Sequence, residues 1–317
     1  MLTALGMRAR RLAARDPWTN VYGIARTLLA LGTGLTLLVN RADILFRPAA
    51  GLPDCPLCSG PARFSFFCLF PKDRLELARW LAFLTLAIVA SGWRPRLTGP
   101  VHWWIAFSLI ASAVAVDGGD HVTAVLTLLL LPVTLTDARV WHWSAPAEQE
   151  KGETRRLVAW SALLAIRLQV AGIYFHAAVS KCRVTEWVDG TVLYYWLTDP
   201  GFGSPPWLRP LLMPILTHAA TVALATWGVL VLEIALSMAL VAPERARGGF
   251  LLAGIALHGG IALLHGLISF AIAMTAALIL YLRAPDRPFR SPLRRSRGSA
   301  GLRAAAPIQG PAPAAAP

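Results

Sequence analysis

This chain has few charged residues, and few of them are acidic. Only 15% of its 317 residues are charged, and 17 acidic residues stand against 30 basic ones. Hydrophobic residues make up 56%, more than a soluble protein of this length needs to fill a core. The composition therefore disfavours an ordinary soluble protein and predicts an all-α, polytopic membrane protein.

The sequence also lacks the short motifs that mark common enzyme classes. It contains no phosphate-binding P-loop, no HExxH zinc motif and no GxSxG nucleophile motif. No internal repeat and no separate soluble domain are evident. No small-residue cleavage site clearly follows the first apolar run, so we expect that run to be retained as a membrane span.

Apolar runs of near-bilayer length recur along the chain. A helix needs about 20 apolar residues to cross a bilayer, and eight segments approach that length: 21–40, 74–93, 99–116, 121–137, 156–181, 213–241, 249–265 and 267–283. Only His265 and Gly266 separate the last two, so seven spans is an alternative. We expect a helical bundle over 21–283, a basic segment over 1–20 and a disordered tail over 284–317.

The basic residues orient this bundle. With a cytoplasmic N-terminus, most Lys and Arg residues fall in the inner loops and the terminal segments, and the outer turn at 117–120 is acidic. This positive-inside pattern predicts that both termini are cytoplasmic. It leaves two large outer loops, 41–73 and 182–212. Because the positive charge is spread over the inner loops, we expect contact with the lipid bilayer and no binding of nucleic acid.

Four cysteines lie in or beside the outer loops. Cys55, Cys58 and Cys68 share the first loop, and Cys182 borders the second. Cys55 and Cys58 form a CxxC unit, which suits a structural disulfide, a thiol-exchange pair or half of a zinc site. Zinc needs about four ligands, and no histidine lies in this loop. One of the three loop cysteines is left over, and Cys182 is a candidate partner for it.

One predicted span carries many polar residues. Arg167, Tyr174 and Lys181 are spaced seven apart, so they share one face of a helix. The opposite face carries Gln169, His176 and Ser180. Polar and ionisable groups at membrane depth are costly and usually functional. We therefore expect this helix to be central, with neighbours on both polar faces.

Lys181 has two interpretations. Its long stem can carry the ammonium group to the membrane surface. Alternatively, the bundle partly desolvates the amine, and burial favours the neutral form that acts as a base or nucleophile. Glu233, within the sixth span, must be protonated or paired, and Arg167 or Arg26 are candidate partners. His258 shares a face with a histidine seven residues later; we predict helix–helix hydrogen bonds there and no metal.

The second outer loop is rich in aromatic residues. Pro and Gly are so dense over 201–214 that we expect no helix there. Together with Trp187 and 194–196, this stretch forms an aromatic surface that suits a lipid-like or peptide ligand. Plain anchoring at the membrane interface is the alternative.

Two parts of the chain resemble a known superfamily. Tyr174-Phe175-x-Ala177-x-x-x-Lys181, followed by Glu186-Trp187-x-Asp189-Gly190, is similar to the core motif of the vitamin K-dependent gamma-carboxylase-like superfamily. Its bacterial members are described as horizontally transferred transmembrane domain proteins. The cysteine loop, with Asp43–Phe46 before it and Phe67–Leu69 at its end, looks most like the sporulation-delaying protein B family. That bacterial branch is associated with maturation of a secreted peptide toxin.

The resemblance implies roles for individual residues. In the eukaryotic carboxylase the lysine of this motif deprotonates vitamin K hydroquinone, and Lys181 occupies the matching position. Residues predicted to be catalytic are Lys181, His176, Tyr174, Glu233 and His258. Those predicted to bind substrate are Trp187, Asp189 and Arg167. A quinone is the cofactor implied by the resemblance, whereas carboxylation of glutamate is not expected without the carboxylase's large C-terminal part.

Three functions follow from these observations. The favoured one is maturation of an exported precursor peptide at the outer face of the bacterial plasma membrane, with a partner maturation protein. Its chemistry is either lysine-based and quinone-linked or thiol–disulfide exchange at Cys55, Cys58 and Cys68. The second is a non-enzymatic chaperone, assembly or immunity-type factor. The third is a transporter, although no inverted repeat is evident. Whether the protein is an enzyme stays open.

Overall fold

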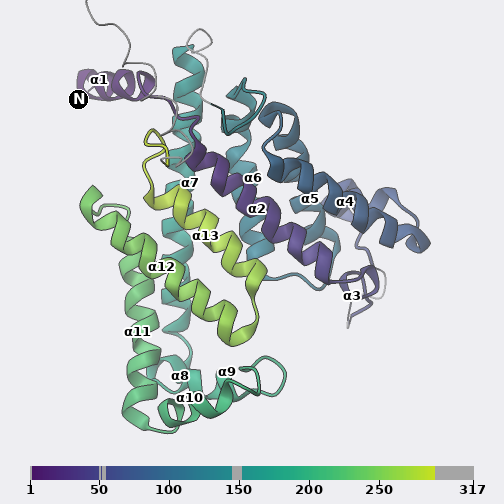
Figure 1. Ribbon diagram of the computed structural model, residues 1–317, viewed down its shortest axis with the longest axis vertical. Coiled ribbons are helices and arrows are strands. Elements are labelled where there is room, and N and C mark those ends of the chain that lie inside the picture. Colours follow the sequence, from purple (N-terminus) through teal and green to yellow (C-terminus); the bar gives the residue numbers. More distant parts are fainter. Residues whose placement is uncertain (1, 50, 52–54, 145–151, 290–317) are drawn as a thin grey trace, which may run out of the picture.

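A computed structural model describes residues 2–49, 51, 55–144 and 152–289, and this part of the chain is all-helical (Figure 1). Its long helices are α2 (Asn20–Val39), α4 (Leu75–Ser91), α5 (Pro95–Ser112), α6 (Gly118–Thr136), α7 (Glu153–Lys181), α11 (Ala219–Met238), α12 (Glu244–His265) and α13 (Ile268–Leu282). Shorter helices are α1 (Leu2–Ala13), α3 (Ala42–Leu45), α8 (Thr185–Val188), α9 (Val192–Thr198) and α10 (Arg209–Leu216). The predicted all-α class is confirmed.

Five of these helices are long and apolar enough to cross a membrane. They are α2, α6, α7, α11 and α12. The shorter α13 is also apolar. The described chain is therefore a helical bundle with several helices of membrane-spanning character, whereas the count of eight spans and the cytoplasmic position of both termini stay predictions.

The centre of the bundle is formed by α2 and α13, which lie side by side (Figure 1). Nearly all residues of α13 from Ala271 to Leu282 are buried. Gly32 of α2 faces the backbone of α13, where a Cβ atom would lie 3.3 Å from the carbonyl oxygen of Ser269. Small residues let membrane helices approach closely, because packing rather than water exclusion drives their association.

Capping residues mark two helix boundaries where the sequence predicts them: the start of α6 and the end of α12. The carboxylate of Asp117 accepts the backbone N–H groups of Gly119 and Asp120, and Asp120 accepts the N–H of Asp117 in return, which caps the start of α6. Gly266, with φ of 72°, ends α12 in the left-handed conformation that favours glycine. The last two apolar runs are therefore separate helices.

The absence of helix predicted over 201–214 is confirmed for 201–208 and wrong for 209–214. Helix α10 begins at Arg209, because Pro210 occupies its first turn, where a missing N–H breaks no intrahelical bond. The predicted sixth span, 213–241, is consequently divided, and α11 begins only at Ala219, after His218.

The beginning of the predicted disordered tail is packed. The side chain of Asn20 and the backbone of Phe289 exchange two hydrogen bonds, at 2.9 and 2.8 Å. The hydroxyl of Thr19 donates to the carbonyl oxygen of Pro285. Residues 284–289 therefore lie against the start of α2, and residues 290–317 fall outside the described part of the chain.

A buried arginine anchors the first half of the bundle. Arg26 on α2 is 1% exposed. It donates to the hydroxyl of Thr98 on α5 at 2.5 Å and lies 3.4 Å from Nδ1 of His142, which follows α6. Gly23 leaves room for the His142 ring, since a Cβ there would lie 3.1 Å from it. Arg26 therefore joins three segments that are distant in the sequence.

An ion pair extends this network. Arg139 and Asp137 are bonded at 2.8 Å, and both side chains are buried. The hydroxyl of Tyr22 donates to the same carboxylate. We call these five residues, Tyr22, Arg26, Asp137, Arg139 and His142, the α2 cluster.

Candidate functional site

The predicted lysine of α7 meets residues from two other helices at one end of the bundle. Nζ of Lys181, the last residue of α7, donates to Oε1 and Oε2 of Glu233 on α11, at 2.7 and 2.8 Å. It also lies 5.2 Å from the centre of the Trp187 ring on α8, a distance at which a cation and an aromatic face attract each other. Lys181, Glu233 and Trp187 thus come together, as a functional site requires.

The predicted partners of Glu233 are wrong. Arg167 lies roughly 21 Å from Lys181 along the axis of α7, at 1.5 Å per residue, and it donates to the carbonyl oxygen of Arg283 at 2.8 Å. Arg26 belongs to the α2 cluster. Sequence spacing places Arg167 and Lys181 on one helix face. The two residues lie so far apart along α7 that they contact different parts of the bundle.

A second polar pair lies deeper in the bundle. Tyr174 on α7 and His258 on α12 are both buried, and the Tyr174 hydroxyl lies 2.9 Å from Nε2 of His258. Nδ1 of His258 is buried and has no hydrogen-bond partner within the described residues. His265 points elsewhere and bonds to the carbonyl oxygen of Phe202 at 3.0 Å. The structure thus keeps the two histidines apart.

The segment after Lys181 forms a turn that holds Trp187 in place. Gly190, with φ of 85°, lies against α11, where a Cβ atom would come within 2.8 Å of the Ala223 methyl group. The carboxylate of Asp189 accepts the backbone N–H and the hydroxyl of Thr191, at 3.0 and 2.6 Å. Asp189, predicted to bind substrate, is therefore bonded within its own turn, and Trp187 itself is buried.

His176 does not join this site. It lies on the opposite face of α7 with Gln169 and Ser180, and all three are exposed. Within the described residues, α6, α11 and α13 pack against the other side of α7, so this part of the chain supplies no neighbour for the polar face of Gln169, His176 and Ser180.

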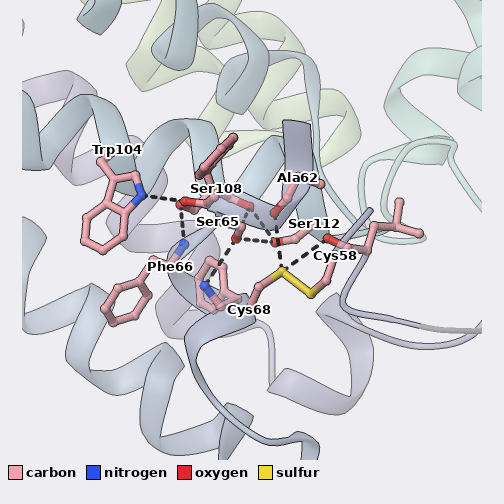
Figure 2. The surroundings of a disulfide bond; sticks show 11 residues. Cys58, Ala62, Ser65, Phe66, Cys68, Trp104, Ser108 and Ser112 are labelled. Carbon is pink, nitrogen blue, oxygen red and sulfur yellow. Dashed lines mark hydrogen bonds between the residues drawn. A yellow bond between two sulfur atoms is a disulfide. The ribbon is translucent and has the colours of Figure 1, made fainter. Parts of the chain in front are cut away.

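The cysteine loop contains a disulfide, which is one of the alternatives that its sequence left open. Cys58 is bonded to Cys68 (Figure 2). Cys55 is buried and does not take part in this bond, and Cys182 is an exposed thiol that follows α7. The CxxC unit is therefore not the bonded pair in this structure, and Cys182 does not bridge the two predicted outer loops.

Two serines of α5 hold the disulfide-bonded loop. The hydroxyl of Ser65 donates to Ser112 at 3.0 Å, and the backbone N–H of Phe66 donates to the hydroxyl of Ser108 at 2.7 Å (Figure 2). Sequence reasoning missed both serines of α5, although their spacing of four on an apolar helix was a usable signal. Beside the loop lies a hollow of about 640 Å³, whose lining includes Arg41, Asp43, Cys55, Asp73 and Glu76.

The chain is similar to two proteins of Bacillus subtilis (strain 168). It is 41% identical over 288 residues to the uncharacterized protein YitO, covering 90% of this chain and 92% of that protein. It is 37% identical over 267 residues to the sporulation-delaying protein SdpB, covering 84% of this chain and 82% of that protein. No family model and no solved structure matches the chain. Because these identities extend over most of each protein, this chain belongs to the family of the sporulation-delaying protein SdpB.

Proposed function

We propose that this protein acts in the bacterial plasma membrane in the maturation of an exported peptide, which binds where Lys181 meets Glu233. The relationship to SdpB supports this role, and so does the resemblance of the cysteine loop to a branch associated with maturation of a secreted peptide toxin. The observation that carries the proposal is the ion pair of Lys181 and Glu233, which different helices hold beside Trp187.

The ion pair suits recognition of a peptide near a membrane surface. The side chains of Lys181 and Glu233 remain 20% and 10% exposed. A peptide segment that presents a carboxylate to Lys181 and an ammonium to Glu233 can therefore exchange partners with this pair without leaving an unpaired charge in the bundle. Charged groups that exchange partners in this way give specificity for a charged terminus or side chain.

The second polar pair extends the proposed site inward. Nδ1 of His258 is buried without a partner within the described residues, and an unpaired buried polar group costs about 1–3 kcal/mol. A ligand that bonds to this nitrogen recovers that cost. Every peptide unit offers one donor and one acceptor for the purpose, proline nitrogen excepted.

The quinone implied by the carboxylase resemblance does not fit these residues as they are arranged. A base that takes a proton from a hydroquinone must be a neutral amine. The carboxylate of Glu233 accepts two hydrogen bonds from Lys181, so Nζ is held as a hydrogen-bond donor in this arrangement and is not free to accept a proton. We draw no step through a quinone and assign Lys181 to binding, with the chemistry shared with a partner maturation protein.

Thiol–disulfide exchange is a second candidate chemistry. Cys58 is exposed, so its bond to Cys68 is open to a thiolate of the peptide. That thiolate would attack one sulfur and release the other as a thiolate, forming a mixed disulfide. A second peptide thiolate would resolve it, leaving an oxidised peptide and a reduced loop.

The test is the mass of the peptides that the native host releases. We would compare wild type, a deletion, Lys181→Met, Glu233→Gln and the double variant Cys58→Ser/Cys68→Ser, each checked for its level in membranes. The matched control is Arg183→Met, which removes an exposed basic residue two positions beyond Lys181.

A peptide that disappears or changes mass in the deletion and in Lys181→Met, but not in Arg183→Met, supports the proposal. The mass difference then identifies the reaction, and an effect confined to the cysteine variant assigns it to thiol exchange. If no released peptide depends on the protein, the proposal is wrong, and the non-enzymatic and transport hypotheses take its place.

A further inference from the structure

The uncovered face of α7 has a polar half and an apolar half that meet at Gly172. The polar half consists of Gln169, His176 and Ser180, all exposed. The apolar half consists of Leu164, Leu168, Phe175 and Val179, which are 40–61% exposed. α7 is one of the helices with membrane-spanning character, yet only 33% of its most apolar window is buried.

This face is unsuited to lipid. Gln169 lies roughly 18 Å from the end of α7 at Lys181, at 1.5 Å per residue, and so falls near the middle of a hydrocarbon core about 30 Å thick. Polar side chains at that depth almost always face protein or a water-filled cavity, because hydrocarbon offers them no hydrogen bond. Another protein chain covering Gln169 and His176 would remove this cost.

The surface around Gly172 is shaped to receive a helix. A hollow of about 520 Å³ is lined by Gln169, Gly172, Ile173, His176 and Ala177. A Cβ atom added at Gly172 would meet nothing within 4 Å. A small residue at such a place allows the backbones of two membrane helices to approach closely.

We propose that the chain covering this face is a second copy of this protein, with α7 packed against α7 about a two-fold axis along the membrane normal. Two copies inserted in the same orientation are related by such an axis, which brings each residue near its own counterpart. The contact must therefore be self-complementary. This inference does not depend on the proposed function.

The residues of the face meet that requirement. The amide of Gln169 and an imidazole such as that of His176 can each offer both a donor and an acceptor, so each can bond to its own copy. No charged residue lies between Gln169 and Ser180, so the face neither repels a second copy nor calls for a partner of opposite charge. Phe175, which is 61% exposed, supplies bulk next to the space at Gly172.

The test is cysteine cross-linking of the full chain in native membranes. In a Cys182→Ser background, Gly172→Cys and His176→Cys would be compared with Leu252→Cys, a control on α12 that is 70% exposed. Two differently tagged copies would be expressed together and oxidised. We expect roughly tenfold more cross-linked product at positions 172 and 176 than at 252, containing both tags. A product that contains a different protein, or no excess over the control, would overturn the proposal.

A second variant keeps the test independent of cysteine reactivity. Gln169→Leu/His176→Leu preserves side-chain bulk but removes both polar groups. We expect the co-purification of the two tagged copies to fall roughly tenfold, through loss of interhelical hydrogen bonds, while membrane levels stay equal to wild type. Unchanged co-purification, or more of it, would show that the polar half of the face does not join two copies. Released peptides are a separate readout, so failure here leaves the proposed function standing.

Discussion

The α2 cluster and the Lys181 site both bring charged groups into the bundle, but the side chains of the two sites differ in how far they are buried. Asp137 and Arg139 have side chains 1% and 7% exposed, whereas those of Glu233 and Lys181 are 10% and 20% exposed. The α2 cluster connects helices at the centre, and the Lys181 site lies among helices with much uncovered surface. A sealed network of charges holds helices together, while a partly open pair retains the capacity to exchange one partner for a ligand.

The packing of the two regions explains this difference. In α2, 67% of the most apolar window is buried, against 22% in α11 and 11% in α12. A glycine makes the close packing around α2 possible. Gly92, with φ of 88°, has no side chain and leaves space that the His142 ring fills. The side chain of Glu233 on α11 accordingly remains 10% exposed, although His258 on α12 is buried.

The largest effect should come from breaking the sealed cluster. Asp137→Ala leaves Arg139 buried without its carboxylate, which typically costs about 3–5 kcal/mol. We expect a large drop in the thermal unfolding midpoint of the detergent-purified protein and a low level in membranes. The control Asp43→Ala removes a carboxylate from an exposed pair with Arg41, for which about 0–1 kcal/mol is expected. Equal losses in the two variants would remove the distinction between the regions.

A smaller effect is expected at the Lys181 site. Lys181→Met and Glu233→Leu should each lower the free energy of unfolding by about 1.5–3 kcal/mol, the value of a hydrogen bond to a charged group. The double variant Lys181→Met/Glu233→Leu should be less destabilised than the sum of the two, because it leaves no unpaired charge.

The peptide readout separates stability from function at this site. If the double variant regains stability but still releases no mature peptide, the pair has a role beyond packing, as proposed. Recovery of the mature peptide in the double variant would instead make the pair a structural device like the α2 cluster.

The smallest expected effect is a dependence on pH within the α2 cluster. Burial first, and then Arg26 and Arg139, lower the pKa of His142 from 6.5 to about 3. Between these values the folded protein keeps His142 neutral while the unfolded chain binds a proton. The free energy of unfolding therefore falls as the pH drops below 6.5, by up to about 1.4 kcal/mol per pH unit.

This slope is measured from unfolding midpoints at pH 7.5 and 5.5. His142→Gln should lose less stability over that interval than wild type, whereas the exposed control His218→Gln should behave as wild type does. The same decrease in all three proteins would show that His142 is not the group that titrates.

Much of the local structure could be predicted from the sequence. Apolar composition and run length indicated helices close to those observed, because each helix satisfies its own backbone hydrogen bonds. The spacing of Tyr174 and Lys181 correctly placed them on one face of α7. The end of the Pro- and Gly-rich stretch at 201–214 was misjudged, because Pro210 is tolerated in the first turn of α10.

Sequence alone indicated an all-α membrane protein and the polar faces of α7, since these depend on composition and on contacts between near neighbours. For the cysteine loop it left a structural disulfide, thiol exchange and zinc binding as alternatives. Only the tertiary structure decided that Glu233 pairs with Lys181, that Cys58 bonds to Cys68 and that His176 faces outward. Helix periodicity assigns a residue to a face, but which helix lies against that face depends on packing between segments far apart in the chain.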